Sequence, residues 1–460
     1  MSATKSISTS LAILLALATS TSAQVGEPRG VIQSKALLAP WSPEETVLYS
    51  GATVHTVSGE TLSPGFLLAK GAKILSVSKT APATKAHRTV DLKGLHLFPG
   101  IILPTSSLGL TEISAVRATQ DTTETGTFTP DVRAWLAVNP DSELIPVARA
   151  NGITHALVLP LGGVVSGQSG VISLAGWTME EMTVKAPVAL HVFWPAMNLN
   201  VTPKELARST KAKSPDDQAK ERTRRVKELD DFFSEAHAYA NARGITPKDA
   251  KPAAKVPAWE AMLPFVRGEL PLIVHADDVR QIKAAIAWAD TRKYKITIAG
   301  GRDAWRVADE LATKKVPVIF ESTFDQPFRD TDAYDSHFKA AAALHKAGVK
   351  VLFSEGPGAS AAAFARNVPY LAAQSVAFGL PESEALKGLT LYPAQVLGLE
   401  QRLGSLDAGK EATFFASDGN ILDLRTNVKR MWIAGREVSL DSRHTRLYEK
   451  YQARPAPAAK

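Results

Sequence analysis

The chain has 460 residues, of which 45% are hydrophobic and 22% are charged, values that are ordinary for a globular protein with a sizeable core. Its 53 lysines and arginines exceed its 46 aspartates and glutamates, but they are spread along the chain rather than gathered in one block. We therefore predict no nucleic-acid partner. The absence of cysteine excludes disulfides, thiolate sites and lipid attachment through a cysteine.

The first 23 residues have the three-part pattern of a secretory signal peptide. Lys5 precedes an apolar stretch at residues 11–18, and small residues lead to Ala23, after which we expect cleavage. The apolar stretch is too short to span a bilayer, so we predict an exported protein, periplasmic or secreted, without a membrane anchor. A frayed N-terminus of a cytosolic protein is the alternative interpretation. Residues 24–43 are predicted to form a linker.

Short strands are predicted towards both ends of the chain. These strands cover residues 47–57, 66–69, 73–77, 412–416 and 428–433. They are separated by short turns that contain glycine, which is typical of a small β-domain. We assign residues 44–98 together with 405–441 to one composite β-sandwich domain.

The central region alternates apolar strands with helix-period segments. The predicted strands are 100–103, 155–159, 188–193, 272–274, 295–299, 316–320 and 350–353, and the predicted helices are 142–150, 279–291, 304–314 and 337–347. This alternation indicates parallel βαβ units, and their number favours a (β/α)8 barrel of the TIM type over residues 99–404. A charged segment at about 203–262 is interpreted as an inserted amphipathic helix, and residues 442–460 as a partly disordered tail.

Three stretches together resemble the amidohydrolase superfamily, especially its imidazolonepropionase-like branch. They are residues 89–102, which end in Phe98-Pro99-Gly100-Ile101-Ile102, residues 389–412, and the closing strands 428–438. The resemblance implies a (β/α) barrel with a composite β-domain and a site at the C-terminal ends of the strands. It also implies hydrolysis of amide, lactam or related C–N bonds by water that one or two divalent metals activate.

The metal ligands that the resemblance implies are only partly present. The His-x-His pair expected at the end of the first strand falls on Thr105 and Ser107, and glycine stands where the strand-six histidine is expected. Hydroxyls are poor zinc ligands beside imidazole. The strand-five histidine is His275, and Glu355 lies at or near the position of the strand-eight aspartate. We predict at most one divalent metal, most plausibly zinc, held by His275, Glu355 and His191, or none.

Other polar residues are expected at the same end of the barrel. His191 and Glu321 lie at the ends of apolar strands, where the favoured interpretation of each is a structural role and the alternative is a site residue. Arg117 belongs to a charged loop after the first strand. The glycine-rich stretch 160–170 is predicted to be a loop that brings Gln168 and Ser169 to the substrate, or else an ordinary flexible turn. We predict substrate contacts from Thr105, Ser107, Gln168, Ser169, Glu321 and Arg117.

Three functions are compatible with these residues. The first is a hydrolase of C–N bonds in a small molecule, with His275 and Glu355 as catalytic residues and at most one metal. The second is an inactive barrel that binds a small molecule or a protein partner, since three expected nitrogen ligands are missing. The third is acid–base catalysis by Glu355 and His275 without a metal. A homodimer is predicted from the resemblance alone.

Overall fold

The computed structural model describes residues 41–199, 213–244 and 255–454. The predicted signal peptide and nearly all of the predicted linker lie outside these ranges, so export stays a prediction. In the described ranges no helix is both long and apolar enough to cross a membrane.

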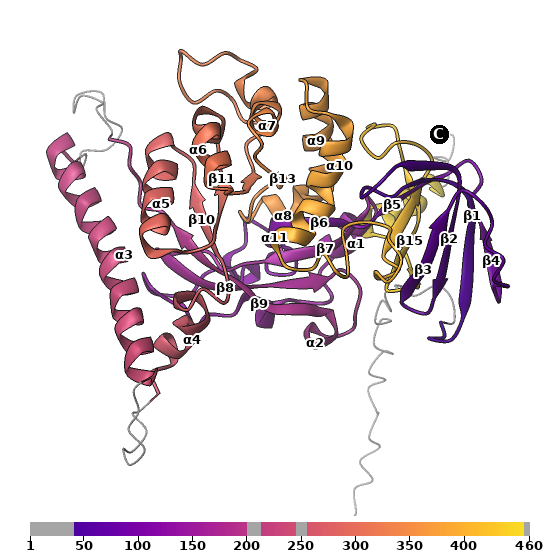
Figure 1. The fold of residues 1–460 in the computed structure, drawn as a ribbon, viewed down its shortest axis with the longest axis horizontal. Coiled ribbons are helices and arrows are strands. Elements are labelled where there is room, and N and C mark those ends of the chain that lie inside the picture. Colours follow the sequence, from indigo (N-terminus) through magenta and orange to yellow (C-terminus); the bar gives the residue numbers. More distant parts are fainter. Residues whose placement is uncertain (1–40, 200–212, 245–254, 455–460) are drawn as a thin grey trace, which may run out of the picture. The chain divides into compact units, whose positions relative to one another are not determined.

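Eight strands form the central sheet, in the spatial order β13-β12-β11-β10-β9-β8-β7-β6 (Figure 1). Their bounds are β6 Ile101–Ser106, β7 Ile153–Val158, β8 Val165–Ser173, β9 Thr183–Phe193, β10 Leu272–Ala276, β11 Ile296–Gly300, β12 Val318–Phe320 and β13 Val351–Phe353. The first and last strands approach each other where Ser354, after β13, donates to the carbonyl oxygen of Thr105 on β6 at 3.0 Å. The sheet is therefore a nearly closed barrel, and the predicted fold class is confirmed.

The helices follow the strands in alternation over most of the barrel. They are α1 Leu144–Arg149, α2 Met179–Met182, α3 Pro215–Gly244, α4 Pro257–Val266, α5 Val279–Arg292, α6 Ala308–Thr313, α7 Ser336–Lys346, α8 Ala361–Phe364, α9 Val368–Ala377, α10 Glu382–Leu389, α11 Leu391–Val396 and α12 Arg443–Gln452. Short 3-10 helices span Arg117–Thr119, Ala134–Ala137, Ala304–Val307 and Ala365–Asn367.

The prediction of a glycine-rich loop at 160–170 is wrong from Val165 onward, because strand β8 begins at that residue. This strand pairs antiparallel with both β7 and β9, so the barrel is not built from parallel units alone. The glycines of this strand interrupt the apolar alternation by which a strand is predicted, but they have a packing role. A Cβ added at Gly170 would lie 3.0 Å from Cβ of Trp135, which indicates a close approach that a side chain would obstruct.

The inserted helix predicted within 203–262 is present as α3, which lies beside α5 (Figure 1). Leu229, Phe233 and Ala236 are buried on one face, as the helical spacing predicts. Asp230 on the same helix pairs with Arg292 of α5 at 2.6 Å. The parts of the insertion at 203–212 and 245–254 lie outside the described residues.

A second sheet combines strands from both ends of the chain. Its members are β1 Thr46–His55, β2 Thr61–Lys70, β3 Lys73–Ser78, β4 Arg88–Asp91, β5 His96–Pro99, β14 Phe414–Ser417, β15 Val428–Ile433 and β16 Arg436–Val438. Strands β14 and β5 pair antiparallel, which joins the two ends of the chain, and β4 pairs with β1. The buried rings of Tyr49, Phe414 and Trp432 pack edge-on or tilted in its core.

The tail predicted to be partly disordered from residue 442 begins with a helix, α12. Ser442 and Thr445 form a capping box at its start, in which the side chain of each bonds the backbone N–H of the other. Arg446 of this helix pairs with Glu143 at 2.9 Å. Residues 455–460 lie outside the described part of the chain.

Candidate active site

A polar layer lies directly above the apolar interior of the barrel. Ala189, Ile273, Ile319 and Leu352 belong to one buried cluster, which residues after α11 extend at its base. Side chains two positions apart on a strand face the same side. The residues two positions further along β9, β10, β12 and β13 are therefore turned to the interior at the C-terminal end, and they are His191, His275, Glu321 and Ser354.

Glu321 is the centre of a carboxyl–hydroxyl cluster in this layer. Thr105 donates from Oγ1 to Glu321 Oε1 at 2.6 Å, and the Ser354 hydroxyl lies 2.7 Å from Thr105 Oγ1. Burial raises the pKa of Glu321 to about 8, assisted by the charges of Asp277 and Asp325 and opposed by the Thr105 hydrogen bond. At neutral pH this carboxyl therefore holds a proton.

Glu355 follows Ser354 and is half-buried at the same mouth. Burial raises its pKa to about 7, and the charge of Asp325 adds to the rise. A Cβ placed on the next residue, Gly356, would lie 3.1 Å from Oε2 of Glu321, so the backbone beside Glu355 approaches that carboxyl closely. Glu355 also lines an open pocket of about 470 Å³, together with Ser114 and Phe364. Burial thus raises the pKa of two carboxyls at the C-terminal end of the barrel, and the backbone that follows Glu355 lies close to Glu321.

His191 and His275 form a pair on neighbouring strands, in which His191 is buried and His275 is partly exposed. His191 Nδ1 lies 3.0 Å from His275 Nε2, and the ring of Phe193 stacks on His275 with centroids 4.0 Å apart. Burial lowers the pKa of His275 to about 3, and burial together with His275 lowers the pKa of His191. Both rings are therefore neutral at physiological pH. His191 Nε2 is buried without a hydrogen-bond partner among the described residues.

The residues predicted to contact substrate separate into two groups. Thr105 belongs to the carboxyl–hydroxyl cluster, Ser107 donates to the Gly358 carbonyl at 3.1 Å, and Ser169 donates to the Ala189 carbonyl at 3.2 Å. All three are buried at the barrel interior or its mouth.

Gln168 and Arg117 lie elsewhere. Because Gln168 is next to Ser169 on β8, it faces the opposite side of the sheet, where its amide donates to the carbonyl of Pro130 at 3.0 Å. Arg117 is exposed and donates to the Gln120 carbonyl within its own loop at 2.6 Å. The structure thus does not bring either side chain to the carboxyl–hydroxyl cluster.

Sequence reasoning missed Ser354 and Asp277 as members of the mouth. Asp277 follows β10, and burial raises its pKa against the opposing influence of Arg302, whose backbone N–H donates to Asp277 Oδ1 at 3.4 Å. The Arg302 guanidinium lies 4.0 Å from the ring centroid of Phe328. Ser354 and Asp277 could have been selected from the sequence by their position, since each follows the carboxyl end of a predicted strand.

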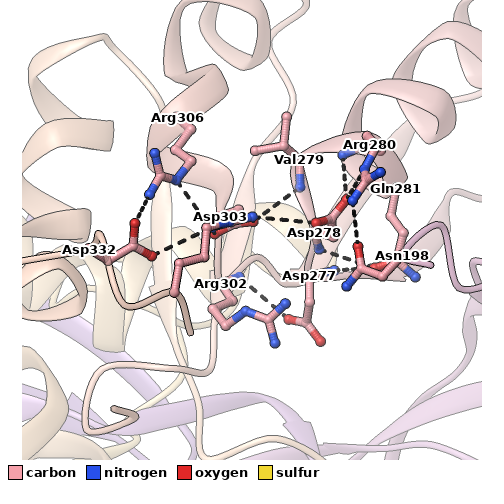
Figure 2. A network of polar contacts seen from close by, with 11 residues as sticks. Asn198, Asp277, Asp278, Val279, Arg280, Gln281, Arg302, Asp303, Arg306 and Asp332 are labelled. Carbon is pink, nitrogen blue, oxygen red and sulfur yellow. Dashed lines mark hydrogen bonds and ion pairs between the residues drawn. The ribbon is translucent and has the colours of Figure 1, made fainter. Parts of the chain in front are cut away.

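An ion-pair network supports the loops after β10, β11 and β12, as Figure 2 shows. Asp303 accepts from Arg329 through both oxygens, at 2.9 and 2.5 Å, and from the backbone N–H of Val279 at 3.3 Å. Burial alone would raise the pKa of Asp303, but its bonds to Arg329 and Val279 outweigh burial and lower it. Asp332 pairs with Arg306 beside it. These bonds hold the loops that carry Asp277 and Arg302.

Replacing Asp303 with alanine is expected to lower the free energy of unfolding by about 3 kcal/mol, because it leaves Arg329 without its main partner and the backbone N–H of Val279 without its acceptor. Urea denaturation followed by circular dichroism measures the difference. The exposed Asp330 in the same region provides the control, Asp330→Ala. The pKa of Asp303 is lowered in the folded chain. The difference in the free energy of unfolding between the wild type and Asp303→Ala should therefore be largest above about pH 4 and shrink as the pH falls further. Equal stability of Asp303→Ala and Asp330→Ala would contradict this role.

Comparison with known proteins identifies the class to which this barrel and its composite sheet belong. Residues 178–438 match the amidohydrolase family. The amidohydrolase tasK of Hapsidospora irregularis is 22% identical over 401 residues, which cover 81% of this chain and 39% of that protein. The imidazolonepropionase of Acinetobacter baumannii is 40% identical over 86 residues, covering 18% of this chain and 21% of that protein. The alignments thus span less than half the length of these curated relatives.

A solved structure supports the same assignment. An amidohydrolase from Thermotoga maritima MSB8 is 27% identical, with a TM-score of 0.72 over 85% of this chain and 99% of that one. The chain belongs to the amidohydrolase family, and the predicted resemblance is confirmed. Imidazolonepropionases are among its distant relatives.

Members of this family are typically metal-dependent, so the donor groups of this barrel decide whether it can hold a metal ion. Across residues 41–199, 213–244 and 255–454, no group of three or more histidines and carboxylates is placed to hold an ion. Thr105 and Ser107 engage protein atoms, and Gly300 and Gly301 offer no side chain. His275 Nε2 already contacts His191. The residues present do not fit the family's metal centre, and the predicted site of His275, Glu355 and His191 is not assembled as a cluster.

Proposed function

We propose that this protein hydrolyses a C–N bond of a small molecule, an amide, lactam or related group, at the C-terminal mouth of the barrel. Glu355 acts as the general base and Glu321 as the general acid. The observation that supports this proposal most strongly is the pair of carboxyls at one mouth whose pKa values are raised to about 7 and about 8. An efficient acid–base group has a pKa near the working pH.

The protonation states assign the two roles. At a pH between the two pKa values, Glu355 is largely ionised and can accept a proton from water, while Glu321 retains its proton and can donate it. Water oxygen bonds to the carbonyl carbon as its proton passes to Glu355. The C–N bond then breaks as Glu321 gives its proton to the leaving nitrogen, and the products are a carboxylic acid and an amine.

The Thr105 hydroxyl fixes the acid in place. Its 2.6 Å bond holds one oxygen of Glu321, and Ser354, which follows β13, donates to the carbonyl oxygen of Thr105. The same bond stabilises the carboxylate that forms when the proton leaves. In this proposal a hydroxyl occupies the position of the first-strand ligand because its neighbour is a carboxyl group and not a metal ion.

His191 and His275 do not transfer protons in this proposal. A histidine whose pKa is lowered to about 3 is not a proton donor at neutral pH, so His275 acts as a neutral hydrogen-bonding group that orients substrate or water. In this proposal His275 is a positioning residue and not an acid–base catalyst as predicted from the sequence. Glu321 is the general acid. The prediction of a homodimer is not part of this proposal.

Hydrolysis of a panel of N-acyl amines and lactams by the full chain, with amine release followed by mass spectrometry, tests the proposal. We expect the turnover to survive dialysis against a chelator. We also expect elemental analysis to find less than one equivalent of bound metal per chain. Turnover that disappears on chelation, returns with zinc and is lost in His275→Ala would replace this mechanism with the single-metal hypothesis.

The missing nitrogen ligands also support the second candidate function, a barrel that binds a small molecule without converting it. A panel compound that raises the melting temperature and is recovered intact would favour this function. Release of amine from that compound would exclude it.

A further inference from the structure

A second pocket lies at the opposite end of the barrel from Glu321 and Glu355. It has a volume of about 700 Å³, which is within the usual range for small-molecule sites. Its wall includes the residues that immediately precede β11, β12 and β13, so it is formed at the N-terminal ends of three adjacent strands. We call it the basal pocket.

Lysines occur at the same place before each of these strands. Lys295 directly precedes β11, Lys314 and Lys315 precede β12, and Lys350 directly precedes β13, and all four line the basal pocket. Because the strands are parallel and neighbouring, these lysines form a row across the N-terminal ends of the three strands. The row results from the topology and is not a charge run in the sequence.

Only part of this positive charge is neutralised. Lys314 pairs with Asp290 at 2.8 Å, and Lys350 donates to the uncharged amide of Gln395 at 2.8 Å. Within the described part of the chain, the ammonium groups of Lys295 and Lys315 have no ion-pair or hydrogen-bond partner. Glu269 is the remaining acidic residue that lines the pocket.

The lining of the basal pocket is otherwise largely apolar. Pro271, Pro317 and Val396 are partly exposed apolar side chains of its wall, contributed by the segments before β10 and β12 and by the end of α11. A concave apolar surface with a few convergent polar groups is the usual composition of a ligand site. An apolar body would contact these side chains, while an anionic group would contact the lysine row.

We propose that the basal pocket binds an organic anion that combines an apolar body with a carboxylate, sulfonate or phosphate group. The site is separate from the mouth that carries Glu321 and Glu355, so the proposal does not depend on the proposed hydrolysis. A solvated lysine row without a ligand is the competing interpretation, and it predicts no saturable binding.

Fluorescence titration of the full chain with anilinonaphthalene sulfonate tests the proposal, because this probe joins an apolar ring system to a sulfonate. We expect saturable binding that weakens at least tenfold in the double variant Lys295→Glu/Lys315→Glu. Higher salt should also weaken binding, since the lysines are exposed. The uncharged analogue phenylnaphthylamine should bind more weakly and respond little to the double variant.

Two further variants make the result specific. Lys85→Glu/Lys93→Glu changes the net charge equally at exposed positions in the connections before and after β4, and it should bind the probe as the wild type does. Lys295→Gln/Lys315→Gln removes charge without reversing it and should give an intermediate loss, with the circular dichroism spectrum unchanged. Equal probe affinity in the wild type and in Lys295→Glu/Lys315→Glu, or no saturable binding in the wild type, would overturn the proposal.

Discussion

Replacing Glu355 with glutamine is expected to lower kcat/KM by about 10³-fold, the scale of effect that general acid–base catalysis usually contributes. The amide keeps the shape of the side chain but cannot accept a proton from water. Wild-type kcat/KM should rise as the pH approaches about 7, where Glu355 ionises, and fall above about 8, where Glu321 loses its proton. A pH–rate profile on the substrate found in the panel measures both limbs.

The control for this variant is Glu124→Gln, an exposed glutamate on a loop after β6. It should leave both limbs of the profile in place. Glu355→Asp should retain part of the activity, because the shorter carboxylate can still accept a proton. A Glu355→Gln protein with wild-type kcat/KM would show that this carboxyl is not the base.

Replacing Glu321 with glutamine is expected to lower kcat/KM by about 10²-fold and to make the protein more stable in alkaline solution. The pKa of Glu321 is raised to about 8 in the folded chain, so between about pH 4.5 and 8 the folded state binds a proton that the unfolded state has lost. Wild-type stability should therefore fall as the pH rises through this window. Glutamine does not titrate and keeps an oxygen for the Thr105 hydroxyl.

Urea denaturation at pH 5 and pH 9 measures this effect. The difference between Glu321→Gln and the wild type should shift in favour of the variant by about 1–3 kcal/mol between the two pH values. Glu124→Gln again serves as the control and should show no such shift. Parallel pH dependences of the variant and the wild type would mean that the pKa of Glu321 is not raised in the folded chain.

Much of the barrel could be predicted because strand and helix periods are local properties of the sequence. The predicted strands at 272–274, 295–299 and 350–353 correspond to β10, β11 and β13 within a residue or two. Strand β8 could not be found in this way. Its glycines are required by close contacts with Trp135 and Val132, which lie more than thirty residues away in the chain.

The candidate site divides in the same manner. His275 and Glu355 could be selected from the sequence because each follows an apolar strand. The absence of first-strand histidines was equally visible, since it depends only on the identities of Thr105 and Ser107. Gln168 was selected because it belongs to the predicted glycine-rich loop 160–170, but the alternation of side chains on β8 turns it to the other face.

The sequence by itself thus determined the fold class, the family resemblance and the loss of expected metal ligands, because these depend on local patterns and residue identities. The tertiary structure decided which groups meet and how they titrate. Thr105 reaches Glu321 across 216 positions of the chain, and His191 reaches His275 across 84. The raised pKa values of Glu321 and Glu355 arise chiefly from burial, which is a property of the packed barrel and of no single residue in it.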